Sequence, residues 1–231
     1  MAKSSHPCTI EVTADNGVML LIDKPKDCSS ARIVNIVKKI LNVKKAGHSG
    51  TLDPKATGLM IVCTGKKTKQ LNQFLDSDKE YEGVMIMGEK TRSFDSETEV
   101  FEKNSTSHLT ADLIKNTVKA FLGEIEQTPP MFSAVKYKGK PLYKFARKGA
   151  ELERKPRMVS IKEFEIGNVN LPEVSFRVLC SKGTYIRTLV NDFGEKLGVG
   201  AYLKELRRTK IGVYDIGSSI TLEQFSDQYK N

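Results

Sequence analysis

A glycine-rich loop carries the residue best suited to chemistry in this sequence. Residues 47–58 read Gly-His-Ser-Gly-Thr-Leu-Asp-Pro-Lys-Ala-Thr-Gly, and their glycines let a backbone approach a ligand closely. Pro54 disfavours helical geometry at Asp53, so the carboxylate is presented from an extended segment. Asp53 is also the only acid between residues 32 and 69, against nine Lys or Arg residues. Surrounding cations keep a carboxylate ionised, as a nucleophile or general base requires, although a glycine-flanked Asp-Pro also occurs in plain turns.

The same loop does not match a phosphate-binding loop. It lacks the G-x-x-x-x-G-K-[ST] arrangement, and a strand rather than a helix is expected after it. Hydrolysis of a nucleoside triphosphate is therefore disfavoured. His48 could stack on a nucleobase or wedge beneath one, and it could equally bond its own loop.

A second group of polar and aromatic residues surrounds a Gly-Thr turn in residues 180–188. Tyr185 and Arg187 lie there at the head of an expected helix, on opposite sides of an inward Ile186, so at least one of them can face a cleft. Arg187 has the planar fork that pairs with a carboxylate or a phosphate. Tyr185 could cover a nucleobase or pack as an ordinary aromatic residue. Tyr81 starts another strand, and Leu206 supplies an apolar wall beside two arginines.

The elements that must position these residues form an α+β mixture in one domain spanning residues 1–231. Apolar runs and alternation predict strands at 18–22, 59–63, 81–87, 173–180 and 211–216. Helical spacing and capping residues predict helices beginning at Ser29 or Ser30, near 112–122, and from Tyr185 to Gly198, with a short last helix capped by Thr221. Residues 43–58 are expected to be a loop, and residues 127–156, rich in Pro, Lys and Tyr, an insertion on the surface.

Charge is segregated along the chain, which has a net charge of +9. Residues 32–69 and 136–157 are strongly basic, whereas residues 76–102 hold nine acids against three basic residues. Such segregation suggests a face that binds a polyanion, because phosphate contacts supply most nucleic-acid affinity. Lysine-rich solvated surfaces would give the same pattern, so charge alone does not identify an RNA.

Composition excludes several classes of protein. No window approaches the roughly 18 consecutive apolar residues of a membrane span, and residues 1–16 lack the order of a signal peptide. The expected location is the cytoplasm. The four cysteines, including Cys8, form no C-x-x-C pair, and only three histidines are present. Neither a disulfide framework nor a zinc site is suggested, and we expect metal-free chemistry.

Six motifs, taken together and in order, resemble the TruB family of tRNA pseudouridine synthases, and the resemblance covers nearly the whole chain from Gly17 onward. They are residues 17–25 (GVMLLIDKP), 47–58, 79–81 (KEY), 127–149 (beginning QTPPMFSAVK), 180–188 (CSKGTYIRT) and 206–209 (LRRT). One such motif would be weak, but six in the family's order are specific. The resemblance implies an α/β fold of the α+β type, with a mixed, mainly antiparallel central sheet and flanking helices.

The resemblance also implies roles for the residues of the site. Asp53 would be the single catalytic carboxylate, with no cofactor. Tyr81 would stack on the target uracil and prime proton removal from its C5, and Arg187 would pair with Asp53. Tyr185 and Leu206 would help line the pocket for the base.

The implied substrate is the uridine at position 55 in the T arm of tRNA. His48 resembles the family histidine that contacts the flipped nucleotide, and the insertion at 127–156 resembles a segment that grips the RNA stem-loop. Its candidate contacts to the RNA backbone are the basic residues Lys136, Lys138, Lys140, Arg147 and Lys148.

Two other functions stay open beside a stand-alone tRNA enzyme. One is a catalytic subunit that guide RNA and partner proteins direct to ribosomal RNA. The guide-dependent branch normally carries a C-terminal RNA-binding (PUA) domain, which is not expected within these 231 residues. The other is a chaperone that binds and refolds tRNA without catalysis. The stand-alone reading implies a monomer with no obligatory protein partner.

Overall fold

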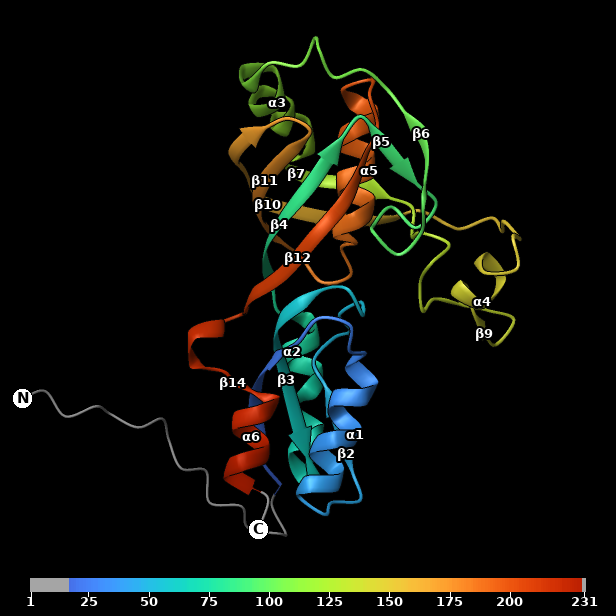
Figure 1. Cartoon of the computed structure of the whole chain (residues 1–231). Helices are drawn as coiled ribbons and strands as arrows, with labels where there is room; N and C mark the ends of the chain where they lie inside the picture. The colour runs from blue at the N-terminus through green and yellow to red at the C-terminus, as the bar shows by residue number, and fades with distance from the viewer. Residues whose placement is uncertain (1–16, 230–231) are drawn as a thin grey trace, which may run out of the picture. The chain divides into compact units, whose positions relative to one another are not determined.

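The structure, a computed structural model, describes residues 17–229 (Figure 1). The polar start at residues 1–16, with Cys8, lies outside the described residues. The chain divides into two units, and each is described by itself. Unit 1 takes the chain up to Lys79 and again from Arg207, whereas unit 2 is Glu80–Leu206. Strands β4 (Lys79–Met87) and β12 (Ala201–Ile211) have residues in both units.

Unit 1 is built on strand β3 (Thr57–Thr64), in which every residue after Thr57 is buried. Strands β1 (Met19–Lys24) and β2 (Ala46–His48) both run antiparallel to it. On the far side of β1 lies β14 (Ile220–Thr221), and β12 adds Arg207 and Arg208 in parallel register with Thr57 and Gly58. A short strand, β13 (Tyr214–Asp215), pairs with the end of β12.

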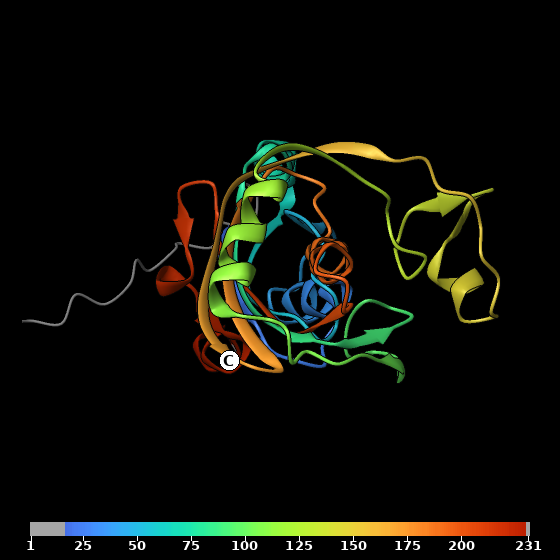
Figure 2. The ribbon, with the colours of Figure 1, turned by 90° about the horizontal axis from the view of Figure 1, so that it is seen from above.

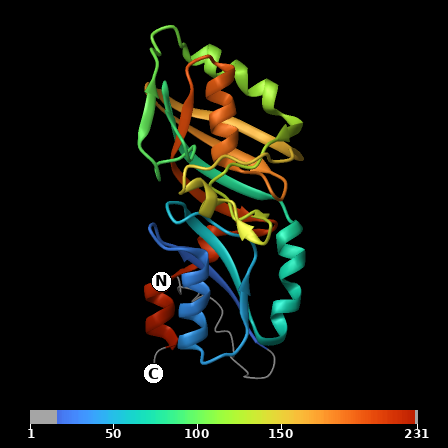
Figure 3. The ribbon, with the colours of Figure 1, turned by 90° about the vertical axis from the view of Figure 1, so that its right-hand side faces the viewer.

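The helices of unit 1 begin where the capping residues indicate. Helix α1 (Ser30–Ile40) is capped by Ser29, whose hydroxyl accepts from the amide of Arg32 at 3.2 Å. Helix α6 (Leu222–Tyr229) is capped by Thr221 and lies beside α1 (Figure 3). The segment after β3 forms a 3-10 turn, η1 (Gly65–Gln70), and α2 (Leu71–Asp76), and a second 3-10 turn, η3 (Ile216–Ser218), precedes β14.

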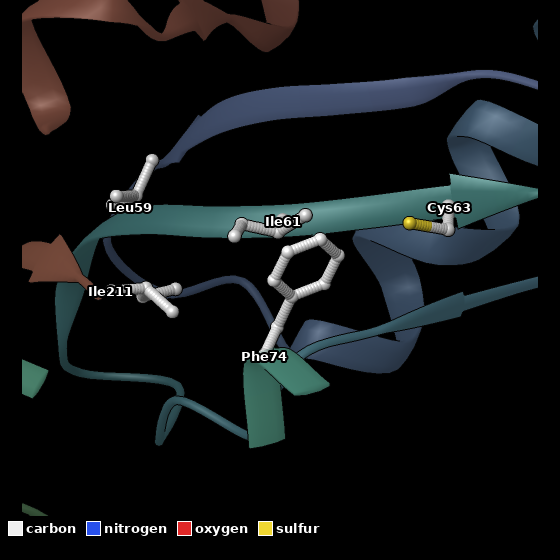
Figure 4. Close-up of a cluster of buried hydrophobic side chains, with 5 residues drawn as sticks. All are labelled: Leu59, Ile61, Cys63, Phe74 and Ile211. Carbon is white, nitrogen blue, oxygen red and sulfur yellow. The ribbon is translucent and has the colours of Figure 1, made fainter. Parts of the chain in front are cut away.

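One face of β3 forms an apolar core with α2. Phe74 of α2 lies over the strand, and its ring meets Tyr214 edge-on at 5.6 Å between centroids. Figure 4 shows this cluster, which comprises Leu59, Ile61, Cys63, Phe74 and Ile211. Fully burying a side chain of this size stabilises a fold by about 1.5–3 kcal/mol. The cluster therefore holds β3, the strand that directly follows the glycine-rich loop.

Unit 2 has a sheet in the order β12-β4-β11-β10-β7. Its longest strand, β10 (Arg157–Asn170), runs antiparallel to both β11 (Glu173–Cys180) and β7 (Gly123–Gln127). Side chains of β11 alternate between buried and partly exposed along most of the strand, as its sequence pattern predicts. A separate pair, β5 (Glu89–Thr91) with β6 (Val100–Lys103), frames the segment between them.

Aromatic side chains join the helices of unit 2 to its sheet. Helix α5 (Ile186–Lys196) places Phe193 against Phe164 of β10, with centroids 5.4 Å apart. Phe121, in the 3-10 turn η2 (Val118–Phe121), touches both of these rings. The preceding helix, α3 (Ala111–Thr117), is capped by Thr110.

The insertion at residues 127–156 connects β7 to β10. It contains a hairpin of β8 (Lys136–Tyr137) and β9 (Lys140–Pro141), followed by one helical turn, α4 (Tyr143–Ala146). Within unit 2, Figures 1 and 2 show it standing apart from the two strands that it connects. Its apolar residues Leu142 and Met131 are buried.

The predicted fold class, an α+β mixture with a mainly antiparallel sheet, is confirmed. Several details differ from the sequence-based expectation, and strands β7 and β10 were not predicted. The expected loop at 43–58 includes the three-residue strand β2, which is too short to show a periodicity. The strand predicted at 211–216 is instead the end of β12, which begins at Ala201, followed by the short strand β13. Among residues 17–229, no helix is long and apolar enough to cross a membrane. The prediction of one domain over 1–231 stays a prediction.

Candidate active site

The glycine-rich loop lies between strands β2 and β3 of unit 1. The two strands are antiparallel neighbours, with His48 opposite Val62, so the loop leaves and re-enters the sheet at one end. The amide of Ala56 donates to the carbonyl of Asp53 at 3.1 Å, which closes a tight turn around Pro54. Asp53 itself is half-buried. Its carboxylate is therefore presented from an ordered turn anchored at both ends.

The first residue of α1 holds the residue before Asp53. The Ser30 hydroxyl donates to the carbonyl of Leu52 at 3.0 Å and accepts from the amide of Leu52 at 2.9 Å. Ser30 and Leu52 are both buried. Because both backbone groups of Leu52 are bound by one hydroxyl, the chain has little freedom to rotate next to Asp53.

A buried lysine lies beneath the turn. Lys24 is fully buried, and its ammonium donates to the carbonyls of Pro25 at 2.9 Å, Cys28 at 2.7 Å and Pro54 at 3.3 Å. Burial lowers the pKa of Lys24, whereas its electrostatic interactions with Cys28 and Asp53 raise it. Lys24 thus ties the start of α1 to the residue that follows Asp53.

A buried arginine holds both ends of the loop. Arg208 is 1% exposed, and its guanidinium donates to the carbonyl of Leu59 at 2.7 Å and to that of Gly50 at 3.2 Å. Gly58 has φ 105° and lies against the backbone of Arg208, where an added Cβ would come within 2.3 Å of the Arg208 carbonyl oxygen. Only glycine fits this close approach. The neighbouring Arg207 instead pairs with Asp23, 2.7 Å away.

His48 bonds its own loop, which was one of the two possibilities left open by the sequence. Its Nδ1 accepts from the amide of Gly50 at 3.2 Å. Burial lowers the pKa of His48, and the nearby Arg208 lowers it further. His48 is therefore held as a neutral ring at neutral pH.

The other predicted site residues belong to unit 2. Tyr81, in β4, is 8% exposed, Leu206 in β12 is half-buried, and Tyr185 is the N-cap residue of α5. Arg187, in the first turn of that helix, is buried, and its guanidinium carbon lies 5.7 Å from the centre of the Tyr185 ring. The structure thus brings Tyr185 and Arg187 together.

An acid that the sequence did not single out lies beside Arg187. A carboxylate oxygen of Asp95 is 3.9 Å from Nη1 of Arg187, and both side chains are buried. The Asp95 carboxylate accepts a hydrogen bond from the Ser93 hydroxyl at 2.5 Å and another from the backbone amide of Glu97 at 2.9 Å. A carboxylate bound in this way is fixed as an acceptor for the guanidinium. Asp95 escaped detection because it sits in an acidic stretch with no local pattern.

The five candidate RNA contacts of the insertion are all exposed, as the sequence predicted for a surface segment. They are Lys136, Lys138, Lys140, Arg147 and Lys148. Arg147 forms an ion pair of 2.8 Å with Glu97 and lies over the ring of Tyr143. Lys138 lies over the ring of Tyr137 in the same hairpin. These cations therefore combine charge with neighbouring aromatic surface.

The predicted site residues fall in both units. Asp53 and His48 belong to unit 1, where Lys24 and Arg208 hold their loop. Tyr81, together with Tyr185, Arg187, Leu206 and the insertion, belongs to unit 2. The supporting roles of Lys24 and Arg208 were not predicted from the sequence. Both side chains donate to backbone carbonyls, and every residue has a carbonyl, so no residue type marks their partners.

Comparison with known families bears on what such residues do. A family model described as TruB family pseudouridylate synthase (N terminal domain) matches residues 38–186, and one described as tRNA pseudouridylate synthase B C-terminal domain matches residues 187–231. The chain belongs to the TruB family. The resemblance drawn from the six motifs is thereby confirmed.

Relatives named tRNA pseudouridine synthase B match over most of their own length. The one from Flavobacterium johnsoniae is 49% identical over 218 residues, covering 91% of this chain and 95% of the relative. The one from Chloroherpeton thalassium is also 49% identical, over 92% of this chain and 90% of the relative.

Two solved structures similar to this TruB chain are of multi-component complexes. A chain of a Cbf5-Nop10-Gar1 complex is 34% identical with a TM-score of 0.75, and the match covers 97% of this chain and 59% of that one. A chain of an H/ACA ribonucleoprotein bound to a substrate RNA containing 2′-deoxyuridine is 31% identical with a TM-score of 0.70, over 93% of this chain and 53% of that one. The present chain thus spans little more than half of these solved chains.

Proposed function

We propose that this TruB chain converts the uridine at position 55 in the T arm of tRNA to pseudouridine. The relatives that match nearly end to end are named tRNA pseudouridine synthase B. The observation that carries the proposal is the loop of residues 47–58, whose half-buried Asp53 is presented from a turn that Ser30, Lys24 and Arg208 hold in place. A carboxylate fixed in this way loses little entropy when it meets a substrate.

The reaction suits a single carboxylate. The bond from N1 of the base to C1′ of the ribose breaks, the uracil turns, and a bond from C5 to C1′ forms while the C5 proton leaves and N1 gains one. No atom is gained or lost overall, so the residues present suffice without a cofactor. Asp53 would act either as the nucleophile towards the sugar or base, or as a base at C2′.

The detached uracil must be kept from escaping while it turns. Tyr81 would stack on it and prime removal of the C5 proton, and Tyr185 and Leu206 would line its pocket. An apolar enclosure also keeps water from the reacting carbon. Arg187, which Asp95 holds at 3.9 Å, would supply the positive charge that pairs with Asp53.

The target nucleotide must first leave its stack, at a cost of a few kcal/mol. The neutral ring of His48 would contact the flipped nucleotide. The insertion would hold the RNA stem-loop by its backbone, through the exposed cations Lys136, Lys138, Lys140, Arg147 and Lys148. Contacts of this kind give affinity without reading sequence.

The likeness to the Cbf5-Nop10-Gar1 complex supports a second candidate function, a catalytic subunit directed by guide RNA. The stand-alone function has the stronger support, because the relatives at 49% identity carry the tRNA name. We further propose that the enzyme acts as a monomer in the cytoplasm without an obligatory protein partner. Assistance with tRNA folding could accompany catalysis.

Replacing Asp53 by Asn tests the proposal. This change keeps the shape of the side chain and removes its charge, so it should lower turnover at least about a thousandfold while RNA affinity stays within about twofold. Release of tritium from tRNA containing 5-tritiated uridine measures turnover, and filter binding measures affinity. Glu126→Gln, the same kind of change at an exposed residue of β7, should leave both values unchanged. Substantial turnover by Asp53→Asn would remove Asp53 from its role.

A further inference from the structure

The backbone of Tyr185 is held by one side chain from a distant strand. The side-chain Nε2 of Gln127 donates to the backbone carbonyl of Tyr185 at 3.1 Å. In return, the backbone amide of Tyr185 donates to Oε1 of Gln127 at 2.7 Å. Gln127 is 1% exposed. Tyr185 is the N-cap residue of α5, and its own side chain makes no capping bond there. The Gln127 amide therefore fixes the position at which α5 begins.

The ring of Tyr185 is held by a second residue. The guanidinium carbon of Arg157 lies 4.7 Å from the centre of the ring, closer than that of Arg187 at 5.7 Å. Arg157 also donates to the carbonyl of Gly183 at 2.5 Å, which anchors it to the turn before the helix. A guanidinium group over an aromatic face is attracted to the ring by its quadrupole. Tyr185 is thus restrained at its backbone by one residue and at its ring by two.

Gln127 and Arg157 are also the two ends of the insertion. They are register partners on the antiparallel strands β7 and β10, opposite each other where the insertion leaves the sheet and returns to it. Every residue between them belongs to the segment that carries the exposed cations. A displacement of this stem would move both restraints on Tyr185 together.

We infer that Gln127 and Arg157 are positioning residues that join the base of the insertion to Tyr185, setting the tyrosine for the target nucleotide. The inference deepens the proposed function and rests on it, because it takes Tyr185 as a residue of the uracil pocket. It adds a physical link between the segment that binds the RNA stem and the residue that meets the base. Gln127 and Arg157 act on the position of Tyr185 and are not proposed to touch the reacting atoms.

Gln127→Glu is the sharpest test. The carboxylate keeps the shape and the accepting oxygen but places a second oxygen against the carbonyl of Tyr185, so one hydrogen bond becomes a repulsion. The rate constant for tritium release at saturating tRNA should fall about tenfold or more, with the dissociation constant for tRNA within about twofold, and the buried charge should also lower the thermal midpoint. Its matched control is again Glu126→Gln, the reverse exchange at the neighbouring exposed residue, which should keep the wild-type rate.

Arg157 gives a second test that does not depend on a fully buried group. Arg157→Leu should lower the same rate constant about fivefold without weakening tRNA binding. Arg157→Lys, which can still donate to Gly183, should recover part of the loss. A fall in the rate of Arg157→Leu that is accompanied by weaker tRNA binding would make Arg157 a phosphate contact and overturn its positioning role.

Different results would refute the proposed function and the positioning role of Gln127 and Arg157. Wild-type protein that releases no tritium from tRNA would refute the proposed function. Active wild-type protein, with Gln127→Glu and Arg157→Leu both keeping the rate within about twofold, would overturn the inference alone. If Gln127→Glu does not fold, the rates of Arg157→Leu and Arg157→Lys test the positioning role by themselves.

Discussion

The glycine-rich loop at 47–58 and the insertion at 127–156 use the same residue types in opposite ways. Around the loop, Lys24 and Arg208 are buried and donate hydrogen bonds to backbone carbonyls. In the insertion, cations such as Lys136 and Lys138 are exposed to solvent. Burying a charge is unfavourable unless hydrogen bonds compensate it, whereas an exposed cation is available to a phosphate. Buried basic residues around the loop therefore hold the backbone, whereas exposed ones in the insertion are free to make the RNA contacts that we propose.

The largest effect expected from this comparison comes from the buried arginine. Arg208→Met would leave the carbonyls of Leu59 and Gly50 without their donor, so the free energy of unfolding should fall by about 3 kcal/mol. Turnover should also fall, because the loop that carries Asp53 loses its anchor at both ends. Denaturant unfolding and tritium release measure the two quantities.

Arg207→Met is the matched control for that change. The side chain of Arg207 is 42% exposed, and its ion pair with Asp23 lies near solvent. Exposed pairs contribute about 1 kcal/mol or less, so its loss should be much smaller. Equal losses at Arg207 and Arg208 would show that burial does not separate the two roles.

The insertion should respond in affinity rather than in stability. Replacing Lys136, Lys138 and Lys140 together by Gln should reduce the slope of log affinity against log salt by up to about one unit for each lost phosphate contact. The free energy of unfolding should change little, because all three are exposed. Filter binding across a salt series measures the slope. Lys115→Gln with Lys119→Gln, two exposed lysines near α3, should leave it unchanged. A slope indifferent to the triple change would assign these lysines to solvated surface.

The smallest effect concerns His48. Its pKa is lowered in the folded state, so below the ordinary histidine pKa the unfolded chain binds more protons than the folded one. His48 should therefore make the protein less stable as the pH falls from neutrality through that value. His48→Gln should flatten this decline in the free energy of unfolding, and His108→Gln, at an exposed residue, should not. An identical decline in the wild type and His48→Gln would contradict a histidine held neutral by burial and Arg208.

The sequence predicted elements well where packing is local. Ser29 and Thr110 cap the helices that their positions indicated, and the alternation in β11 is reproduced residue by residue over most of its length. Strand β12 was largely missed, because a buried Arg208 within a run of charged residues reads as polar surface. Periodicity cannot show that such a residue will find carbonyls inside the fold.

The candidate site shows the same division. Asp53, Tyr81, Tyr185 and Arg187 follow from motifs of adjacent residues, and their roles stay predictions. The residues that hold them in place could not be predicted from these motifs. Gln127 bonds Tyr185, 58 positions away, and Arg208 bonds Leu59, 149 positions away. These pairings depend on strand order, which no single stretch of sequence encodes.

Stand-alone isomerisation of uridine 55 is tested most directly with the purified chain and a synthetic T-arm hairpin. We expect the chain, in the presence of a chelator and without guide RNA, partner protein or nucleotide, to convert the uridine equivalent to position 55 to pseudouridine. Pseudouridine-specific chemical mapping reads the position directly, and a hairpin with cytidine at that position is the control. No modification of the hairpin or of full-length tRNA, with activity appearing only on addition of guide RNA and partner proteins, would contradict the account and favour the guide-directed function.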